Sequence, residues 1–562
     1  MEVGTAGGEL AFEPALEGQR QPLAVSVRGL AKTFHVPHQR YSNLKERLVD
    51  RFRPEPPDRL RALSDVSFTV GRGEFFGIVG RNGSGKSTLL RCMAGIYDYE
   101  EGEVEVSGRL APFVELGAGF TPDLSARDNA VLGAVTLGLS RGEARERVER
   151  ILTFAGLSEF SEMKLRNFST GMNMRLAFSV AIQVDADVLL IDEVLAVGDE
   201  SFRDRCHEEL EQLRDEGRTI VLVTHSMEDL RRHCSRALLL ERGRVERIGS
   251  LEDVAEGYAE MNKRETERER RGLADSEPTL DRTVPASTSR DPATYRPSAL
   301  GDSLRRLREL TLSMAVTDFR LRYSNSALGY LWSVMRPALH FLVLYSIFRH
   351  VTNVGGVPHY AAYLATAIVL WTFFGEVVST GVTSLSQNGP LLRKVRFPRF
   401  AIPFSYSTSS LINLAANSVL VVIVLAVSGV TPRMSWLQMP LLVALLALFA
   451  LGMGTAFSAL YPRYRDMRQL WQVLNQLFFF ASPIIYVAKQ YPDALEPVLS
   501  ANPLAAILTQ MRHALIDPSA PTAAEQLGGT TEVLVPLAVI FATLALGLWL
   551  FNREAPLVAE RA

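Results

Sequence analysis

The pattern of hydrophobic and polar positions divides the chain into two unlike halves. Over residues 23–260, strand-like and helix-like segments alternate. From about residue 330 onward, long apolar runs dominate and charges are confined to short islands. We therefore expect an α/β domain over 23–260 and an all-α membrane domain over 303–562.

Two further segments are polar. Residues 1–22 have neither a basic start nor an apolar core, so we expect a disordered leader and no signal peptide. Residues 261–302 begin with a run of Lys, Arg and Glu and continue as a Pro-, Ser- and Thr-rich stretch. That composition buries little apolar surface and predicts a disordered or loosely tethered linker. Its basic run is more simply explained as a solvated helix end than as a binding site.

Six apolar runs in the last part are long enough to cross a membrane, since about 20 helical residues span the hydrocarbon layer. The first contains Arg336 near its start, and the fifth contains Ser482 and Pro483, where a helix can break. The alternative, six buried helices of a soluble fold, would require all six to pack without charged faces. The expected spans are residues 332–352, 360–384, 402–428, 437–459, 469–488 and 531–551.

Charges between the spans indicate the orientation. Two alternate loops, at 393–399 and 463–468, are rich in Lys and Arg. Alternate loops lie on one side of a membrane, and basic loops stay in the cytoplasm. The first half and both termini are therefore expected on the cytoplasmic side.

Charged residues also occur at the membrane boundary and inside one span. Residues 304–323 mix Leu and Met with several Arg, which suits an amphipathic helix on the membrane surface or, alternatively, an ordinary soluble helix. Glu376 lies within the second span, where a carboxylate costs at least about 2.5 kcal/mol at the bilayer centre. Structural pairing and a role in a transport path are both open for it.

Composition adds two exclusions. The formal net charge is -2, so bulk electrostatics give no reason to expect nucleic acid as a partner. The cysteines, Cys92, Cys206 and Cys234, lie outside any CxxC pair. This argues against a disulfide framework or a zinc site and fits a reducing compartment.

The segment GRNGSGKST, residues 80–88, lies between the strand-like FFGIV and the helix-like LLRCMAGI. This is the context of a phosphate-binding loop, whose glycines let backbone N–H groups approach a phosphate chain. Lys86 is predicted to reach the β- and γ-phosphates of ATP, and Ser87 to ligate Mg²⁺. The other residues predicted to bind nucleotide here are Gly80, Asn82, Gly83, Ser84, Gly85 and Thr88.

Two later strands end in polar residues. DVLLIDE ends in Asp192, predicted to hold Mg²⁺ directly or through water, and Glu193, predicted to act as general base toward the attacking water. A helix-capping acid is the alternative interpretation. His225 follows the apolar run IVLVT, at the edge where parallel sheets bind ligands. We interpret it as a γ-phosphate sensor rather than a structural histidine.

Through these motifs, residues 23–260 resemble the nucleotide-binding domain of ABC transporters. The discriminating segment is FSTGM, residues 168–172, in the place of the family signature. Ser169, Thr170 and Gly171 lie where a helix N-terminus can receive a phosphate. In that family the phosphate belongs to ATP on the opposite subunit, so the resemblance implies a homodimer.

The same resemblance assigns three further positions. Asp199 matches the loop that crosses the dimer interface, and Phe34 is the candidate aromatic that stacks on adenine. Glu115 stands where most members carry a Gln that links Mg²⁺, the attacking water and the membrane domain, and by this resemblance it is the third predicted Mg²⁺ ligand. Thr170 and Met172 also depart from the usual LSGGQ. None of the catalytic residues is lost, so we expect a working ATPase.

Longer stretches point to a subfamily. ELGAGFTPDLSARDNA and DEVLAVGDESF are similar to the ATPase subunits of bacterial exporters of O-antigen and teichoic acid. The stretches 322–339, 394–403, 464–472 and 482–486 resemble their permease subunits. The implied fold is an α/β P-loop ABC ATPase domain followed by an all-α, six-helix permease of the type-two ABC exporters. In those systems the two parts are usually separate chains, so two copies of this fused chain would complete an exporter.

The resemblance implies export of a lipid-linked cell-surface polysaccharide across the bacterial cytoplasmic membrane, with glycan-synthesis enzymes as candidate partners. The loop at 394–400 is the expected contact with the ATPase domain, and 489–530 are expected to form short outer-face helices that gate the exit. Several aromatic residues are candidates to line a channel, although each could equally face lipid. They are Tyr330, Trp332, Trp371, Phe373, Phe374, Phe478, Phe479, Phe480 and Tyr486.

Three other functions were considered. Export of another amphiphile, such as a drug or a lipid, is the main alternative. A soluble ABC-type ATPase acting on ribosomes or DNA is contradicted by the apolar spans. An importer is disfavoured because nothing in the sequence suggests a solute-receptor partner.

Overall fold

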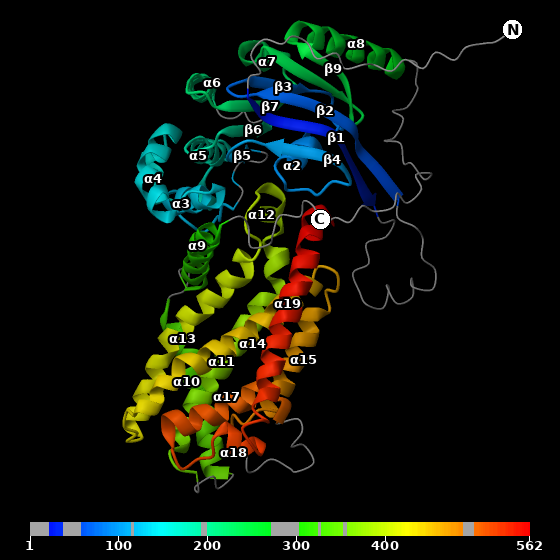
Figure 1. The fold of residues 1–562 in the computed structure, drawn as a ribbon. Helices are drawn as coiled ribbons and strands as arrows, with labels where there is room; N and C mark the ends of the chain where they lie inside the picture. The colour runs from blue at the N-terminus through cyan, green and yellow to red at the C-terminus, as the bar shows by residue number, and fades with distance from the viewer. Residues whose placement is uncertain are drawn as a thin grey trace, which may run out of the picture.

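The computed structural model shows an α/β domain stacked on a bundle of long helices (Figure 1). The two are described below as the α/β domain and the helical bundle. The structure describes residues 22–36, 58–113, 117, 119–192, 199–270, 303–323, 328–351, 357–486 and 500–561.

The α/β domain is built on a six-stranded sheet with the order β5-β6-β7-β3-β8-β9. Its central strands are parallel and almost wholly buried, as expected for apolar runs covered on both faces. The carboxyl ends of β3, β6 and β7 therefore meet at one edge. The strands are β3 (Phe75–Val79), β5 (Leu110–Phe113), β6 (Val188–Asp192), β7 (Thr219–Thr224), β8 (Arg236–Glu241) and, antiparallel to β8, β9 (Arg244–Ser250).

A second, three-stranded sheet is antiparallel and has the order β2-β1-β4. Its strands are β1 (Leu23–Val36), β2 (Asp58–Gly71) and β4 (Glu101–Val106). Apolar residues of this sheet share one core with β3 and with helix α2 (Lys86–Met93). The helix that follows the phosphate loop is thus packed between the two sheets.

A layer of helices covers the β5–β6 side of the main sheet. It consists of α3 (Ala126–Leu137), α4 (Arg141–Ala155) and α5 (Thr170–Ile182), with the short 3-10 turns η1 (Ser158–Phe160) and η2 (Leu165–Asn167). Each of the three helices begins after a serine whose side chain accepts a backbone N–H of the first turn. The caps are Ser125, Ser140 and Ser169.

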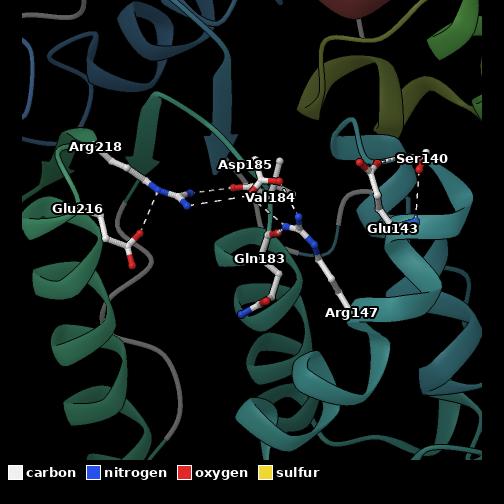
Figure 2. A network of polar contacts seen from close by, with 8 residues as sticks. All are labelled: Ser140, Glu143, Arg147, Gln183, Val184, Asp185, Glu216 and Arg218. Carbon is white, nitrogen blue, oxygen red and sulfur yellow. Dashed lines mark hydrogen bonds and ion pairs between the residues drawn. The ribbon is translucent and has the colours of Figure 1, made fainter.

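An ion-pair network fastens this layer to the sheet (Figure 2). Arg147 of α4 donates to the Asp185 carboxylate at 2.6 Å and to the Gln183 carbonyl. Arg218, just before β7, donates to the Val184 carbonyl at 3.2 Å and lies 4.0 Å from Asp185. The hydrogen bond from Arg147 lowers the pKa of Asp185. The network fixes the loop between α5 and β6, and hence where Asp192 emerges.

The other helices of the domain are α6 (Glu200–Asp215), α7 (Met227–His233) and α8 (Leu251–Arg270). Helix α8 continues past residue 260, so the predicted domain boundary falls inside a helix. The basic run at its end belongs to α8, as the solvated-helix interpretation had it. The three cysteines are buried free thiols.

Among the described residues, five helices are long and apolar enough to cross a membrane. They correspond to the first four predicted spans and to the sixth. They are α10 (Leu331–Val351), α11 (Tyr360–Gln387), α13 (Ala401–Val427), α14 (Met439–Leu460, preceded by the 3-10 turn η6, Met434–Gln438) and α19 (Leu534–Arg561).

The predicted fifth span differs from the structure. Helix α15 runs only from Met467 to Phe480, 14 residues, and the chain then turns at 481–486. At about 1.5 Å per residue it is shorter than the roughly 30 Å hydrocarbon layer. The turn is fixed by the Asn502 amide, which donates to the buried Ser482 hydroxyl at 2.9 Å, and by Tyr363, which donates to the Pro483 carbonyl. The expectation of a helix through residue 488 is therefore wrong.

Short helices follow α15 at the end of the bundle that lies away from the α/β domain (Figure 1). They are α17 (Pro503–Met511), the π-helical turn η9 (Arg512–Ile516) and α18 (Ala523–Leu527). Short helices were predicted within 489–530, and residues 487–499 lie outside the described part of the chain.

Two elements join the bundle to the α/β domain. They are α9 (Leu304–Tyr323) and α12 (Gly389–Lys394), and both share an apolar cluster with the helical layer. Arg306 of α9 donates to the Thr136 carbonyl at 3.4 Å and to the Arg396 carbonyl at 3.2 Å. A Cβ added at Gly119 would lie 3.2 Å from the Leu391 side chain. A Cβ added at Gly95 of the α/β domain would lie 3.2 Å from the Arg396 side chain, so the predicted contact through the loop at 394–400 is confirmed.

Candidate active site

The phosphate loop lies between β3 and α2, as the sequence predicts. Lys86 is the first residue of α2, and its side chain is buried. Its ammonium donates to the carbonyls of Gly80 and Arg81, at 2.8 and 2.9 Å. The loop is thus folded around a lysine whose charge is held at its centre.

Two glycines of the loop are required for different reasons. A Cβ on Gly80 would lie 2.3 Å from the Leu240 carbonyl oxygen of β8, so only a residue without a side chain fits there. Gly83 has φ +81 and open space around it, which is the left-handed region that glycine adopts freely. The Gly243 N–H, in the turn between β8 and β9, donates to the Ser84 carbonyl at 2.8 Å and braces the loop from outside. This hydrogen bond from Gly243 could not be predicted, because no pattern in the sequence indicates it.

The loop fits a phosphate chain chemically. Ser84 is buried, and its hydroxyl has no hydrogen-bond partner in the described structure. Asn82 is exposed, while Ser87 and Thr88 on the first turn of α2 are half-buried. An ammonium, a hydroxyl without a partner and a helix N-terminus together form a site for an anion.

Strand register brings the other predicted residues to the same edge. Val79 pairs with Thr224, and Asp192 pairs with Val223 on the other side of β7. Asp192 and His225 therefore emerge beside the loop that begins at Gly80. Asp192 is half-buried and His225 is exposed, so both are accessible to a ligand at this edge. A carboxylate and the Ser87 hydroxyl are oxygen ligands of the kind that Mg²⁺ prefers.

Two residues of the predicted site cannot be placed. Glu193, the predicted general base, and Glu115, the predicted Mg²⁺ ligand, lie outside the described residues. Their assignments stay predictions from the sequence.

The signature residues lie on a different part of the domain. Ser169 caps α5, with its hydroxyl accepting the Met172 N–H at 3.2 Å, and Thr170 and Gly171 form the first turn. Helix α5 packs with α3 and α4, whereas α2 belongs to the core between the two sheets. Within one chain, the signature thus begins a helix of the helical layer, whose later residues Phe178 and Ile182 pack on the main sheet, while the phosphate loop leads into α2 between the two sheets.

Asp199 and Phe34 have local structural partners. Asp199 is exposed and caps α6, accepting the Phe202 N–H at 3.1 Å, and this hydrogen bond lowers its pKa. Phe34 on β1 is half-buried and meets the Tyr97 ring edge-on, with the centroids 5.6 Å apart. The Lys32 ammonium lies 5.2 Å from the Phe34 centroid. The contact of Asp199 with a second chain and the contact of Phe34 with adenine stay predictions from the sequence.

Glu376 of the helical bundle is paired. It forms an ion pair with Arg322 at the end of α9 and accepts from the Asn413 amide at 2.6 Å and the Ser410 hydroxyl at 3.2 Å. Tyr323 in turn donates to Asn413 at 3.3 Å. Of the two interpretations left open, the structure supports structural pairing.

The aromatic residues proposed for a channel divide into three groups by exposure, of which Phe478, Phe479 and Tyr486 are half-buried. Trp371, Phe373 and Phe374 are buried among α11, α14 and α15, with Phe374 stacked on Phe449 at 5.4 Å. These three are packing residues, and their proposed channel role is not supported. Tyr330, Trp332 and Phe480 are exposed, as a surface-lining role requires.

Each half of the chain matches a family of known proteins. Residues 63–196 match the ABC transporter family, and residues 309–516 match the ABC-2 type transporter family. An O-antigen export system ATP-binding protein, RfbB of Klebsiella pneumoniae, is 46% identical over 197 residues, which cover 35% of this chain and 80% of that protein. The chain belongs to the ABC transporter family. It is a membrane protein whose ATP-hydrolysing domain is coupled to transport.

Other relatives of this ABC transporter carry similar names. The RfbB protein of Myxococcus xanthus is 40% identical over 42% of this chain, and the chain spans 56% of that relative's length. A teichoic acids export ATP-binding protein, TagH of Staphylococcus haemolyticus, is 31% identical over 43% of this chain and 90% of its own length. Among solved structures, the dimeric, post-hydrolysis cassette MJ0796 has a TM-score of 0.34 and 24% identity, covering 40% of this chain and 98% of that chain.

Proposed function

We propose that two copies of this chain form an exporter that uses ATP to move a lipid-linked cell-surface polysaccharide across the bacterial cytoplasmic membrane. The observation that carries the proposal is the fusion of a cassette with an ABC-2 type membrane domain in one chain whose relatives are named for O-antigen and teichoic acid export. Export of a drug or of another lipid is the competing outcome.

Separate placement of the signature and the phosphate loop supports a dimer. Ser169 belongs to the helical layer, while Lys86 belongs to the core between the sheets. A γ-phosphate held by Lys86 would therefore be completed by the Ser169 helix of the second copy. Each ATP would then be bound by both cassettes and hold them together, and its hydrolysis would let the two cassettes separate.

The chemistry proposed for each residue follows from its place. Lys86 neutralises the phosphates, Ser87 and Asp192 hold Mg²⁺, and His225 contacts the γ-phosphate from the end of β7. Glu193 would polarise the attacking water. Bound Mg²⁺ would supply charge neutralisation at the β- and γ-phosphates.

Several contacts support a cytoplasmic cassette. Arg463, in one basic loop, lies 4.0 Å from Glu554 near the end of α19. The other basic loop follows α12, which contacts both α19 and the α/β domain. Both basic loops and the end of α19 thus share the cassette end of the bundle (Figure 1). Under the rule that basic loops stay inside, that end faces the cytoplasm and the short helices α17 and α18 face outward.

A polar face on α15 is our candidate for the surface that meets the second copy or the substrate. Gln469, Gln472 and Gln476 are exposed on this helix. Amide side chains gain nothing from contact with lipid, so such a face is expected to meet protein or an aqueous path. Sugar hydroxyls would find hydrogen-bond partners there.

The test is replacement of the wild-type protein by Glu193→Gln in its host, followed by mass spectrometry of lipid-linked glycans on the cytoplasmic side. We expect a polymeric glycan to accumulate inside and to disappear from the surface. Unchanged glycan pools, combined with ATPase activity of the purified wild-type protein that Lys86→Ala abolishes, would overturn the proposed substrate and leave the transporter assignment standing.

A further inference from the structure

The last turns of α8 contact the phosphate loop. Glu265 of α8 lies with a carboxylate oxygen 3.3 Å from the Arg81 guanidinium, and Arg81 is the second residue of the loop. The Glu265 side chain is only 15% exposed, while the Arg81 side chain is 39% exposed. None of the sequence motifs includes Glu265.

Arg81 is connected directly to the lysine that binds phosphate. Its backbone carbonyl accepts the Lys86 ammonium at 2.9 Å. A side-chain restraint on Arg81 therefore also restrains one of the two carbonyls that hold Lys86. The connection runs from the Glu265 carboxylate through the Arg81 side chain and main chain to the Lys86 charge.

Helix α8 is a firm support for this contact. Val254 and Met261 are buried in the core beneath the main sheet. The position of Glu265 is thus set by the sheet and does not depend on the loop that it contacts.

We infer that Glu265 is a positioning residue of the nucleotide site. By holding Arg81, it keeps the entrance of the phosphate loop in the shape that Lys86 and the backbone N–H groups need when the phosphates arrive. Loss of the pair leaves a loop that must be ordered on binding, which weakens ATP binding more than it slows hydrolysis. The same contact joins the nucleotide site to the helix end from which the chain leaves the α/β domain at Arg270.

The experiment compares Glu265→Gln with Glu260→Gln in the full-length, detergent-solubilised protein. Both variants remove one carboxylate from α8. Glu260 is 44% exposed and pairs with Arg247 of β9 and with Arg264, whereas Glu265 pairs with Arg81 of the loop. For Glu265→Gln we expect the KM for ATP to rise about two- to five-fold, the range that a partly exposed ion pair supports, with kcat within about two-fold of wild type. Glu260→Gln should leave both constants unchanged.

Exchanging the charges of Arg81 and Glu265 provides a second test, which applies even if a single variant folds poorly. The double variant Arg81→Glu with Glu265→Arg should recover a lower KM than Arg81→Glu alone, because the ion pair is restored with its direction reversed. An unchanged KM in Glu265→Gln would overturn the inference. So would equal changes in Glu265→Gln and Glu260→Gln, or the absence of any rescue by the exchange.

Discussion

At the scale of single residues, the phosphate loop depends on backbone geometry that only particular residues allow. Sequence spacing was enough to identify Lys86 and the strand ends at Asp192 and His225, because a strand, a glycine-rich loop and a helix leave little choice of arrangement. The brace from Gly243 and the pair between Arg81 and Glu265 could not be predicted. Both join residues far apart in sequence through tertiary packing, and neither has a local pattern.

The first residue-scale prediction concerns Gly83→Ala, with Gly217→Ala as its matched control. Both glycines have strongly positive φ, +81 and +87, and neither would bring an added Cβ within 4 Å of another group. Each variant should lower the free energy of unfolding by about 1–2 kcal/mol through backbone strain. Only Gly83→Ala should also weaken ATP binding, because its methyl group lies in the phosphate loop. Equilibrium binding and thermal unfolding of both variants would check this, and equal ATP affinities would contradict it.

The second residue-scale prediction concerns a buried histidine pair. His207 Nδ1 and His233 Nε2 are 2.7 Å apart, and the His233 ring stacks on Phe75 at 5.0 Å. Burial lowers the pKa of His233 to about 4 and also lowers the pKa of His207. The Glu211 carboxylate lies 3.7 Å from His233. Both rings must therefore stay neutral in the folded domain.

Because these folded pKa values lie below the unfolded value of about 6.5, stability is complete above pH 6.5 and falls as pH drops toward 4. His233 alone should cost about 2 kcal/mol at pH 5 relative to neutral pH. Thermal unfolding at pH 7.5 and 5.0 measures the effect. The fall should be smaller in His233→Gln, and an identical fall in wild type and variant would refute the assignment.

At the scale of elements, hydropathy located the long helices well and the short ones poorly. The first four spans and the sixth correspond to helices of 21 to 28 residues, since uninterrupted apolar runs have few other stable forms. Helix α15 ends early because side chains from α11 and from the segment before α17 satisfy the backbone at the turn. The sequence marks the place only through Ser482 and Pro483, where a helix can break, and the partners that stabilise the turn are non-local. The antiparallel sheet of β1, β2 and β4 was not predicted, because its pairing is also non-local.

Helix α9 is one of the two elements that join the α/β domain to the bundle. Arg306→Ala removes the bonds to Thr136 of the helical layer and to Arg396 beside α12. We predict that this variant keeps most of its ATPase activity while transport falls at least about ten-fold. Arg308→Ala is the control on the same helix, because Arg308 is 70% exposed and pairs only within α9 among the described contacts. Parallel losses of ATPase and transport in Arg306→Ala would argue against a coupling role.

The pair of Glu376 with Arg322 ties the other end of α9 to α11. Glu376→Ala and Arg322→Ala should each lower the thermal unfolding midpoint, and the double variant should be less destabilised than the sum. A coupling energy of about 0.5–3 kcal/mol is expected for groups in direct contact. Strict additivity in this cycle would show that the two side chains do not support each other.

At the scale of the whole molecule, the sequence predicted two functional halves in one chain, and both are matched by known families. How two copies meet could not be predicted, because no local pattern marks a contact between two chains. The exposed glutamines of α15 and the exposed Ser169 helix end are our candidate surfaces for that meeting. Both surfaces are part of the proposal that two copies of this chain form a complete exporter.

The most direct test of that claim is transport by liposomes that contain this chain as their only protein. A lipid-linked polysaccharide would be supplied on the cassette side, and its arrival on the opposite side would be measured by protection from an added glycosidase. We predict ATP-dependent transfer that Lys86→Ala abolishes. Hydrolysis of ATP with no movement of glycan until a second membrane protein is added would contradict it.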